Sequence, residues 1–137
     1  MSGLTSELHC VVITPEKQVV DARAFDVVLP AFDGLRGVLP GHAPLMCRMG
    51  TGLLRYHDQQ NQLQKVFIDG GFGHIQNNEV TILTPGALTR KNLTMEQARE
   101  QLQQAEALPV TTVAQVARRR SAIRRARQLL LLVENKS

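Results

Sequence analysis

The hydrophobic pattern of the chain changes its period near residue 92. Before that point, short segments are β-branched or alternate apolar with polar residues, and turn-forming residues separate them every few positions. After it, apolar residues recur at three- and four-residue spacing, which is typical of helices that pack along one face. The pattern predicts a mostly β plus α fold, in which an N-terminal antiparallel β-sandwich, or flattened barrel, precedes a C-terminal two-helix hairpin.

The β region holds a series of candidate strands and one clear hairpin turn. In residues 24–30, alternation places Phe25, Val27 and Leu29 on one face. Asn77 and Asn78 stand between two alternating segments and predict a two-residue turn. The candidate strands are residues 9–13, 17–22, 24–30, 36–39, 45–49, 53–57, 63–69, 73–76 and 80–84.

Capping boxes mark the starts of two helices. Thr94 is followed by Gln97 and Thr112 by Gln115, the spacing at which cap and third residue exchange hydrogen bonds. The apolar stripes are Met95, Ala98, Leu102 and Ala105 in the first helix, and Val113, Val116, Ile123, Leu130 and Val133 in the second. Packing of these stripes predicts a hairpin, so the chain divides into a β domain, residues 1–87, and a helical hairpin, residues 88–137.

Basic residues are concentrated in the last third of the chain. Residues 1–87 carry six Lys+Arg against eight Asp+Glu, a net charge of −2, whereas residues 88–137 carry ten against four, a net charge of +6. Six arginines lie between Arg118 and Arg127. An arginine run without lysine favours an acceptor that takes two hydrogen bonds from one guanidinium, either carboxylate or phosphate. The alternative is a solvated helix face that only adds solubility.

Helical geometry suggests which of these arginines can reach a partner. With Ile123 taken as the buried direction and about 100° per residue, Arg118 and Arg125 lie on nearly the opposite side of the helix. Arg124 lies to one side. We therefore expect Arg118 and Arg125 to face outward.

The sequence offers no recognisable catalytic or metal-binding set. The four histidines show no paired ligand spacing, no nucleophile, base and orienting acid can be nominated, and no phosphate-cradling glycine loop is followed by a lysine. Cys10 and Cys47 lie in apolar runs, which favours buried reduced thiols in a cytosolic compartment, with a disulfide between them as the alternative. The pattern predicts neither a signal peptide nor a membrane-spanning segment.

A rigid turn is predicted at Pro40 and Gly41. Proline fixes φ at the first corner, glycine supplies a positive φ at the second, and Pro44 stiffens the exit. His42 would then stand on a protruding loop. Taken alone, it is interpreted as a structural loop histidine rather than a metal ligand or a general base.

Several motifs, in one order and at one spacing, resemble the epsilon subunit of F-type ATP synthases. They are GVLPGHAPL at residues 37–45, GTGLLRY at 50–56, GGFGHI at 70–75, VTILTPGA at 80–87 and AIRRARQLLLLVENK at 122–136. The resemblance covers essentially the whole chain. It implies a non-catalytic rotor subunit of the central stalk, which couples ion flow through the c-ring to rotation and ATP synthesis.

The resemblance also implies partners for the β-sandwich. It would attach to the gamma subunit and rest on the membrane-embedded c-ring, near the loop from Asp33 to His42, and would touch the membrane only through the complex. Leu35 and Arg36 stand where family members often carry an acidic residue. The implied gamma and c-ring contacts are Asp33, Gly34, Leu35, Arg36, Pro40, Gly41 and His42. The implied location is the cytoplasmic face of the bacterial inner membrane.

For the hairpin, the resemblance implies an inhibitory role. An extended hairpin would reach along gamma to the alpha and beta subunits and block rotation in the hydrolysis direction. Arg118, Arg124 and Arg125 would meet acidic loops there, which would make carboxylate the acceptor. Arg118 and Arg125 align with family arginines implicated in inhibition or nucleotide sensing.

Some family members bind ATP between the two helices. Thr94, Gln97 and Ala98 stand here at the aligned positions of the first helix, and Leu129 stands where the second helix would carry an arginine. Of the charged side chains of that site, mainly Arg118 and Arg125 remain as weak candidates for nucleotide binding. We therefore expect no cofactor.

Two other classes remain as alternatives. One is a nucleic-acid-binding module that uses the arginine-rich helix. The acidic β region, the absence of Trp and the presence of only one Tyr and four Phe argue against it, because few aromatic rings are available for stacking. The other is a cupin-like metalloenzyme, which would need clustered His and carboxylate ligands.

Overall fold

The computed structural model describes residues 7–134. The first six residues of the predicted β domain and the last three of the predicted hairpin therefore lie outside it. Contacts divide the chain into two compact units, one ending at Thr89 and one beginning at Arg90. The division lies two residues beyond the predicted one, because a short strand at Ala87–Thr89 extends the sheet.

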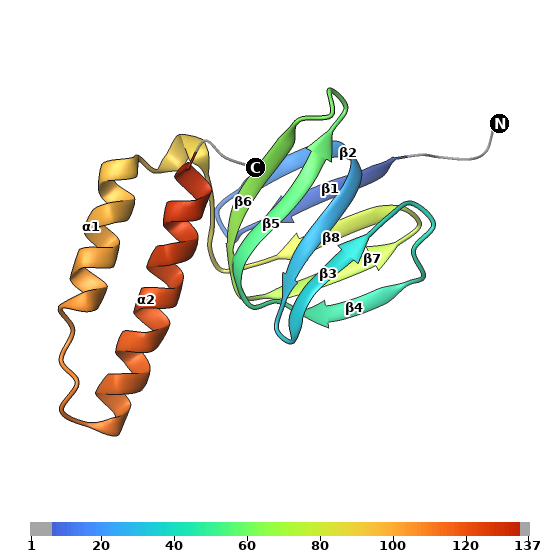
Figure 1. The fold of residues 1–137 in the computed structure, drawn as a ribbon. Helices are drawn as coiled ribbons and strands as arrows, with labels where there is room; N and C mark the ends of the chain where they lie inside the picture. Colours follow the sequence, from blue (N-terminus) through green and yellow to red (C-terminus); the bar gives the residue numbers. More distant parts are fainter. Residues whose placement is uncertain (1–6, 135–137) are drawn as a thin grey trace. The chain divides into compact units, whose positions relative to one another are not determined.

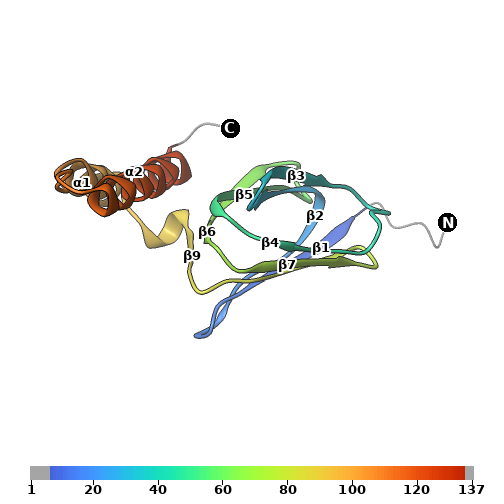
Figure 2. The same ribbon diagram turned by 90° about the horizontal axis from the view of Figure 1, so that it is seen from below.

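Within the described residues 7–89, nine strands form the β unit (Figure 1). Their bounds are β1 Leu8–Ile13, β2 Gln18–Ala31, β3 Gly34–Val38, β4 Leu45–Arg48, β5 Thr51–Asp58, β6 Leu63–Asp69, β7 Phe72–Gln76, β8 Glu79–Leu83 and β9 Ala87–Thr89. The order in the sheet is β4-β7-β8-β1-β2-β5-β6-β9, and β3 pairs with β2. The sheet is not closed, and it folds over so that β1, β4 and β7 lie in one layer and β2, β3 and β5 in the other (Figure 2).

One pairing departs from the predicted antiparallel arrangement. Strands β1 and β8 run parallel, with Cys10 opposite Val80, whereas the other paired strands are antiparallel. The two strands are far apart in sequence, so no hairpin turn links them and no local pattern could show their direction. The predicted β-sandwich with a following helical hairpin is nevertheless confirmed.

Two predicted strands are one. From Gln18 on, the predicted strands 17–22 and 24–30 belong to the continuous strand β2, and a bulge at Phe25 shifts its register against β5 between Ala24 and Asp26. The prediction that Phe25 shares a face with Val27 and Leu29 is wrong, because the extra residue of a bulge reverses the alternation. Phe25 is 39% exposed, whereas Val27 and Leu29 are fully buried.

Alternating apolar side chains fill the space between the layers. Full burial of a Val, Leu or Ile side chain contributes about 1.5 to 3 kcal/mol to the free energy of unfolding, relative to an exposed side chain. The largest fully buried side chains of the β unit include Leu8, Val12, Val27, Leu29, Val38, Leu53, Leu54, Val66, Ile68, Ile75 and Ile82. Both cysteines are free, with Cys10 buried and Cys47 half-buried, and the alternative disulfide is not formed.

The turn between β7 and β8 is the predicted two-residue hairpin. Asn77 and Asn78 both have positive φ, at 52° and 61°, and Gln76 pairs with Glu79 across the turn. Positive φ at both corners gives the turn a twist that matches the twist of the strands. At the other end of β7, Gly71 has φ +104°, and a Cβ there would overlap the carbonyl oxygen of Leu83. Only glycine lets β7 approach β8 so closely at this point.

The second unit holds a short 3-10 helix, η1 (Arg90–Asn92), and two α-helices, α1 (Met95–Glu106) and α2 (Val113–Val133). Both predicted capping boxes are present: Thr94 and Gln97 exchange hydrogen bonds at the start of α1, and Thr112 and Gln115 do so at α2. Each satisfies backbone donors that a helix start leaves open. No helix within residues 7–134 has both the length and the apolar character needed to cross a membrane.

The seam between the helices agrees with the prediction for α1 but not for α2. Ala98 and Ala105 of α1 are buried, as predicted. In α2 the buried residues are Ala126, Leu129 and Leu132, whereas Val113, predicted to lie in the seam, is 88% exposed. The prediction failed because α2 carries apolar residues around much of its circumference, so the position of the small alanines decides which face can approach α1.

Candidate partner-binding surfaces

The predicted Pro40–Gly41 turn is present. The backbone N–H of His42 donates to the carbonyl oxygen of Leu39 at 3.1 Å, and Gly41 has φ +88°, which is the geometry of a type II turn. His42 is partly exposed, and its Nδ1 lies 2.6 Å from the carbonyl oxygen of Ala43. The histidine is therefore held against its own loop.

A second turn connects β2 and β3. Ala31 pairs with Gly34, so Phe32 and Asp33 form the turn, and the guanidinium of Arg48 lies 4.4 Å from the centre of the Phe32 ring. Phe32 is 66% exposed and Leu35 71% exposed. Arg36 is half-buried, and its Nε has no hydrogen-bond partner among residues 7–134.

The residues predicted for the c-ring contact do not form one loop. Residues 34–38 are strand β3, which pairs with β2 from Gly34 opposite Ala31 to Val38 opposite Val27. At about 3.3 Å per residue, the four steps of this strand separate its ends by about 13 Å. Asp33, Gly34 and Leu35 thus lie at one end of β3, and Pro40, Gly41 and His42 lie beyond the other.

An exposed apolar surface was missed in the sequence. Met46, Phe72 and Leu83, which we call the outer apolar patch, lie on the adjacent strands β4, β7 and β8 and are each more than half exposed. Arg48 is opposite Phe72, and Phe72 is opposite Leu83. The sequence did contain a signal for this patch. In these strands the side chains of Ile75, Val80 and Ile82 alternate to the inner face, which places the apolar residues Phe72 and Leu83 on the outer face. Such patches mark contact sites with other proteins.

Cross-strand pairs of histidine and carboxylate lie on the same unit. His9 Nε2 is 2.6 Å from Asp21 Oδ1, and His9 Nδ1 is 3.3 Å from Glu79 Oε2. The hydrogen bond from His9 is the main cause that lowers the pKa of Asp21 below its ordinary value of 3.8. His57 Nδ1 lies 2.9 Å from Asp26 Oδ1. In the described part of the chain, no group of three or more His, Cys, Asp or Glu side chains is arranged to hold a metal ion.

The corrected seam changes the placement of the α2 arginines. Arg118, Arg124 and Arg125 are all exposed. Measured at about 100° per residue from Leu129, the middle one of the three buried residues, Arg118 and Arg125 lie about 20° and 40° away and Arg124 about 140° away. Arg118 and Arg125 are therefore exposed, as expected, but they lie on the seam side of the helix and not opposite the seam.

A groove of about 520 Å³ runs along another side of α2. It is lined by Val110, Val116, Arg119, Arg120, Ile123, Arg124, Arg127 and Gln128. Arg119 donates from Nε to the carbonyl oxygen of Glu106, which ties α2 to the end of α1. Within residues 7–134, no carboxylate forms an ion pair with Arg118, Arg120, Arg124 or Arg127. Within the described residues, these four arginines present positive charge that no carboxylate pairs.

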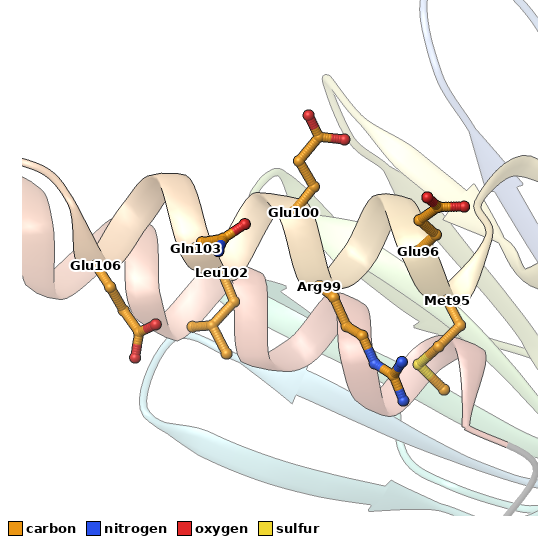
Figure 3. A pocket seen from close by; sticks show the side chains of 7 residues that line it. All are labelled: Met95, Glu96, Arg99, Glu100, Leu102, Gln103 and Glu106. Atoms are coloured by element: carbon orange, nitrogen blue, oxygen red, sulfur yellow. The ribbon is translucent and has the colours of Figure 1, made fainter.

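The positions aligned with nucleotide ligands have other roles here. Thr94 and Gln97 are engaged with each other in the capping box, and Ala98 and Leu129 are buried. A groove of about 950 Å³ beside α1 is instead lined by Met95, Glu96, Arg99, Glu100, Leu102, Gln103 and Glu106. Figure 3 shows Arg99 and Met95 on one side of the helix and Glu100 on the other. Three of these seven side chains are acidic, which disfavours an anionic ligand.

The chain is similar to known proteins over both units. Residues 7–90 match the family described as ATP synthase, Delta/Epsilon chain, beta-sandwich domain. The ATP synthase epsilon chain of Rhodopirellula baltica is 38% identical over 88% of this chain and 93% of its own length. That of Nostoc punctiforme is 43% identical over 70% of this chain and 71% of its own length.

Chains in two solved ATP synthase structures have this fold. A chain in the cryo-EM structure of the Euglena gracilis mitochondrial ATP synthase, OSCP/F1/c-ring, aligns with a TM-score of 0.81 at 18% identity, covering 97% of this chain and 85% of that one. A chain in the central stalk/c-ring structure of the Tetrahymena thermophila enzyme aligns with a TM-score of 0.64 at 14% identity, covering 93% and 98%. The nucleic-acid alternative is not supported by these relatives. The family match and the identity to curated relatives together assign this chain to the ATP synthase epsilon chain family.

Proposed function

We propose that this chain is a non-catalytic rotor subunit of an F-type ATP synthase, which couples ion flow through the c-ring to rotation and ATP synthesis. The observation that carries the proposal is the match to epsilon chains over both units, at 38% identity across 88% of the chain. A tagged copy expressed in its host should co-purify with gamma, alpha and beta subunits, and the isolated chain should not hydrolyse ATP. Recovery of the tagged chain without any of these subunits would contradict the proposal.

The two turns beside β3 are the proposed c-ring contacts. Asp33, Gly34 and Leu35 belong to one end, Arg36 to the middle of β3, and Pro40, Gly41 and His42 to the other end. This proposal is supported by two exposed leucines. Leu35 lies on the hairpin of β2 and β3, and Leu39 lies on the hydrogen-bonded Pro40–Gly41 turn. Leu35→Asp and Leu39→Asp should each lower ion pumping per ATP hydrolysed in reconstituted vesicles. Because the turns are separated by β3, the two variants show which end carries the contact.

Gamma is the proposed partner of the outer apolar patch. Three large apolar side chains more than half exposed on adjacent strands need a cover in the assembled protein. Phe72→Ser should weaken gamma binding at least tenfold, since losing a well-packed aromatic anchor typically costs about 2 kcal/mol or more. Val113→Ser, at an exposed site of the other unit, is the matched control. An equal effect of both substitutions on gamma binding would refute the assignment of the outer apolar patch to gamma.

The helical unit is proposed to inhibit ATP hydrolysis through carboxylates of the alpha and beta subunits. The support is the set of exposed arginines of α2, of which Arg118 and Arg124 have no internal ion pair among the described residues. Exposed ion pairs contribute about 0.2 to 1 kcal/mol each, and charge reversal adds repulsion. Arg118→Glu with Arg125→Glu should therefore raise the hydrolysis rate of the assembled enzyme.

A matched control uses the groove on the other side of α2. Arg120→Glu with Arg127→Glu makes the same change of charge at positions that line the groove. The pair that raises hydrolysis more identifies the inhibitory side of the helix. If neither pair changes the rate while deletion of residues 90–137 does, inhibition runs through other residues.

Attachment is proposed to be a property of the β unit alone. We propose that residues 1–89 are sufficient for attachment, because the sheet ends with β9 and its core is complete without the helices. Truncation after Thr89 should leave gamma binding intact, whereas truncation after Ala87 removes most of β9 and should weaken the edge of the sheet. Failure of the longer fragment alone to bind gamma would refute this proposal.

The proposed location is the cytoplasmic face of a bacterial inner membrane, with membrane contact only through the complex. A tagged chain should sediment with membranes and leave them when the F1 portion is stripped at low ionic strength. A chain that stays on stripped membranes would contradict contact through the complex alone.

A further inference from the structure

We infer that Asn78 is a positioning residue for the Leu39–His42 turn, and the inference rests on the proposed contact between this turn and the c-ring. Asn78 lies 37 positions further along the chain from Gly41, in the turn between β7 and β8. Its side-chain Oδ1 accepts a hydrogen bond from the backbone N–H of Gly41 at 2.7 Å.

Asn78 has a firmly held backbone. It has φ 61° in the two-residue turn, and Gln76 pairs with Glu79 across that turn. Its own carbonyl oxygen accepts the backbone N–H of His9 at 2.8 Å, which fastens it to β1. The adjacent Glu79 reaches His9 as well, with 3.3 Å between Oε2 and Nδ1. The side-chain acceptor therefore projects from a point fixed by three strands.

The loop between β3 and β4, residues 39–44, has few other ties. One hydrogen bond joins His42 N–H to Leu39 oxygen, and another contact joins His42 Nδ1 to Ala43 oxygen. Both lie within the loop. Among residues 7–134, the bond from Gly41 to Asn78 is the hydrogen bond that joins this loop to the rest of the sandwich.

The bond fixes the direction of one particular peptide group. Gly41 is the second corner of the type II turn, with φ +88°, and glycine at this position has wide backbone freedom. The Gly41 N–H is exposed, and its bond to a fixed acceptor favours one orientation of the Pro40–Gly41 peptide. Without the acceptor, the turn retains its shape through the Leu39–His42 bond but loses its fixed position on the sandwich.

Hydrogen exchange on the full-length chain tests the positioning directly. In Asn78→Gly the positive φ is retained and only the acceptor is lost, so the fold is preserved. The Gly41 amide should exchange roughly three- to tenfold faster, as expected for loss of one hydrogen bond. Asn78→Asp keeps an acceptor oxygen and should restore slow exchange. Asn77→Gly, the same change at the neighbouring corner, should leave Gly41 unaffected. Unchanged Gly41 exchange in Asn78→Gly would overturn the inference.

The functional arm compares these variants with a direct change in the turn. In reconstituted enzyme, Asn78→Gly should lower ion pumping per ATP hydrolysed, and Asn78→Asp and Asn77→Gly should not. Leu39→Asp, which alters the proposed contact itself, should lower it as well. If Leu39→Asp lowers pumping and Asn78→Gly does not, the positioning role is refuted while the contact stands. If neither lowers pumping, the proposed contact at this turn fails, and the role of Asn78 in rotation fails with it.

Discussion

The close approach of β7 and β8 at Gly71 gives a sharp prediction. Gly70 and Gly71 both have positive φ, at 82° and 104°, so alanine at either position adopts a backbone conformation that L residues disfavour. Their surroundings differ. A Cβ at Gly70 meets nothing within 4 Å, whereas a Cβ at Gly71 overlaps the carbonyl oxygen of Leu83 and comes to 2.8 Å from the Cα of Thr84. The two substitutions therefore share one cost and differ in another.

The magnitudes follow from these two costs. Left-handed backbone costs an alanine about 1 to 2 kcal/mol, and the stiffer unfolded chain returns about 0.4 to 1 kcal/mol. Gly70→Ala should thus cost between about 0 and 1.6 kcal/mol. Gly71→Ala adds a collision with backbone that cannot rotate away, and overpacking of this kind costs about 1 to 3 kcal/mol more. For a domain of this size, each kcal/mol lowers Tm by about 4 to 8 °C.

Tyr56 provides the assay. It is the single tyrosine of a chain without tryptophan, and it is buried on β5, so its fluorescence reports unfolding of the β unit. Urea titrations of wild type, Gly70→Ala and Gly71→Ala should give midpoints in descending order. Displacement of β7 would also separate Phe72 from Leu83, so Gly71→Ala should bind gamma more weakly than Gly70→Ala. Equal destabilisation by the two alanines would show that the contact with Leu83 does not matter.

Three further predictions concern single groups. Hydrogen bonding from His9 lowers the pKa of Asp21, so Asp21 adds stability that is present above pH 3.8 and lost as pH falls through the lowered folded-state pKa. In thermal melts between pH 6 and 2.5, Asp21→Asn should therefore lose less stability in acid than wild type or the exposed control Glu16→Gln. Parallel losses in all three proteins would refute this. Burial raises the pKa of the Cys10 thiol to about 12. Iodoacetamide at pH 8 should therefore leave Cys10 unmodified in the native chain and label it after urea unfolding. Labelling of the native chain, detected by mass spectrometry, would count against the burial of Cys10. Calorimetry should detect weak or no ATP binding, since Thr94 and Gln97 are engaged in capping, and saturable micromolar binding that disappears in Arg125→Ala would show a surviving site.

Features fixed by neighbouring residues were predicted from the sequence. The capping boxes at Thr94 and Thr112, the Asn77–Asn78 turn and the Pro40–Gly41 turn each depend on residue types within four positions. Local chemistry favours these conformations without help from tertiary contacts. They also include much of the candidate site, because Gly41 and His42 stand on one of these turns.

Features that depend on distant strands were not predicted. The parallel pairing of β1 with β8, the bond from Gly41 to Asn78 and the cluster of His9 with Asp21 and Glu79 all join segments that no local pattern relates. Phe25 was misplaced for a related reason, since a bulge depends on the register of the partner strand. The strand at residues 87–89 was missed because three residues are too few to show an alternation.

The misassigned seam of α2 shows how differently the two units are specified. The β unit buries large aliphatic side chains, whereas three of the five buried residues of α1 and α2 are alanines: Ala98, Ala105 and Ala126. Alanine lets helices approach closely but removes little apolar surface from water, so Leu129 and Leu132 are the large side chains whose full burial stabilises α1 and α2. Meanwhile Val113 and Val116 remain exposed on α2 beside its arginines. This hairpin is held by fewer large buried side chains than the β unit, so contacts with a partner that covers those valines and arginines would compete with its own packing. The proposed inhibitory role needs such a balance, because a partner shifts a conformational population only by its differential affinity for the two states.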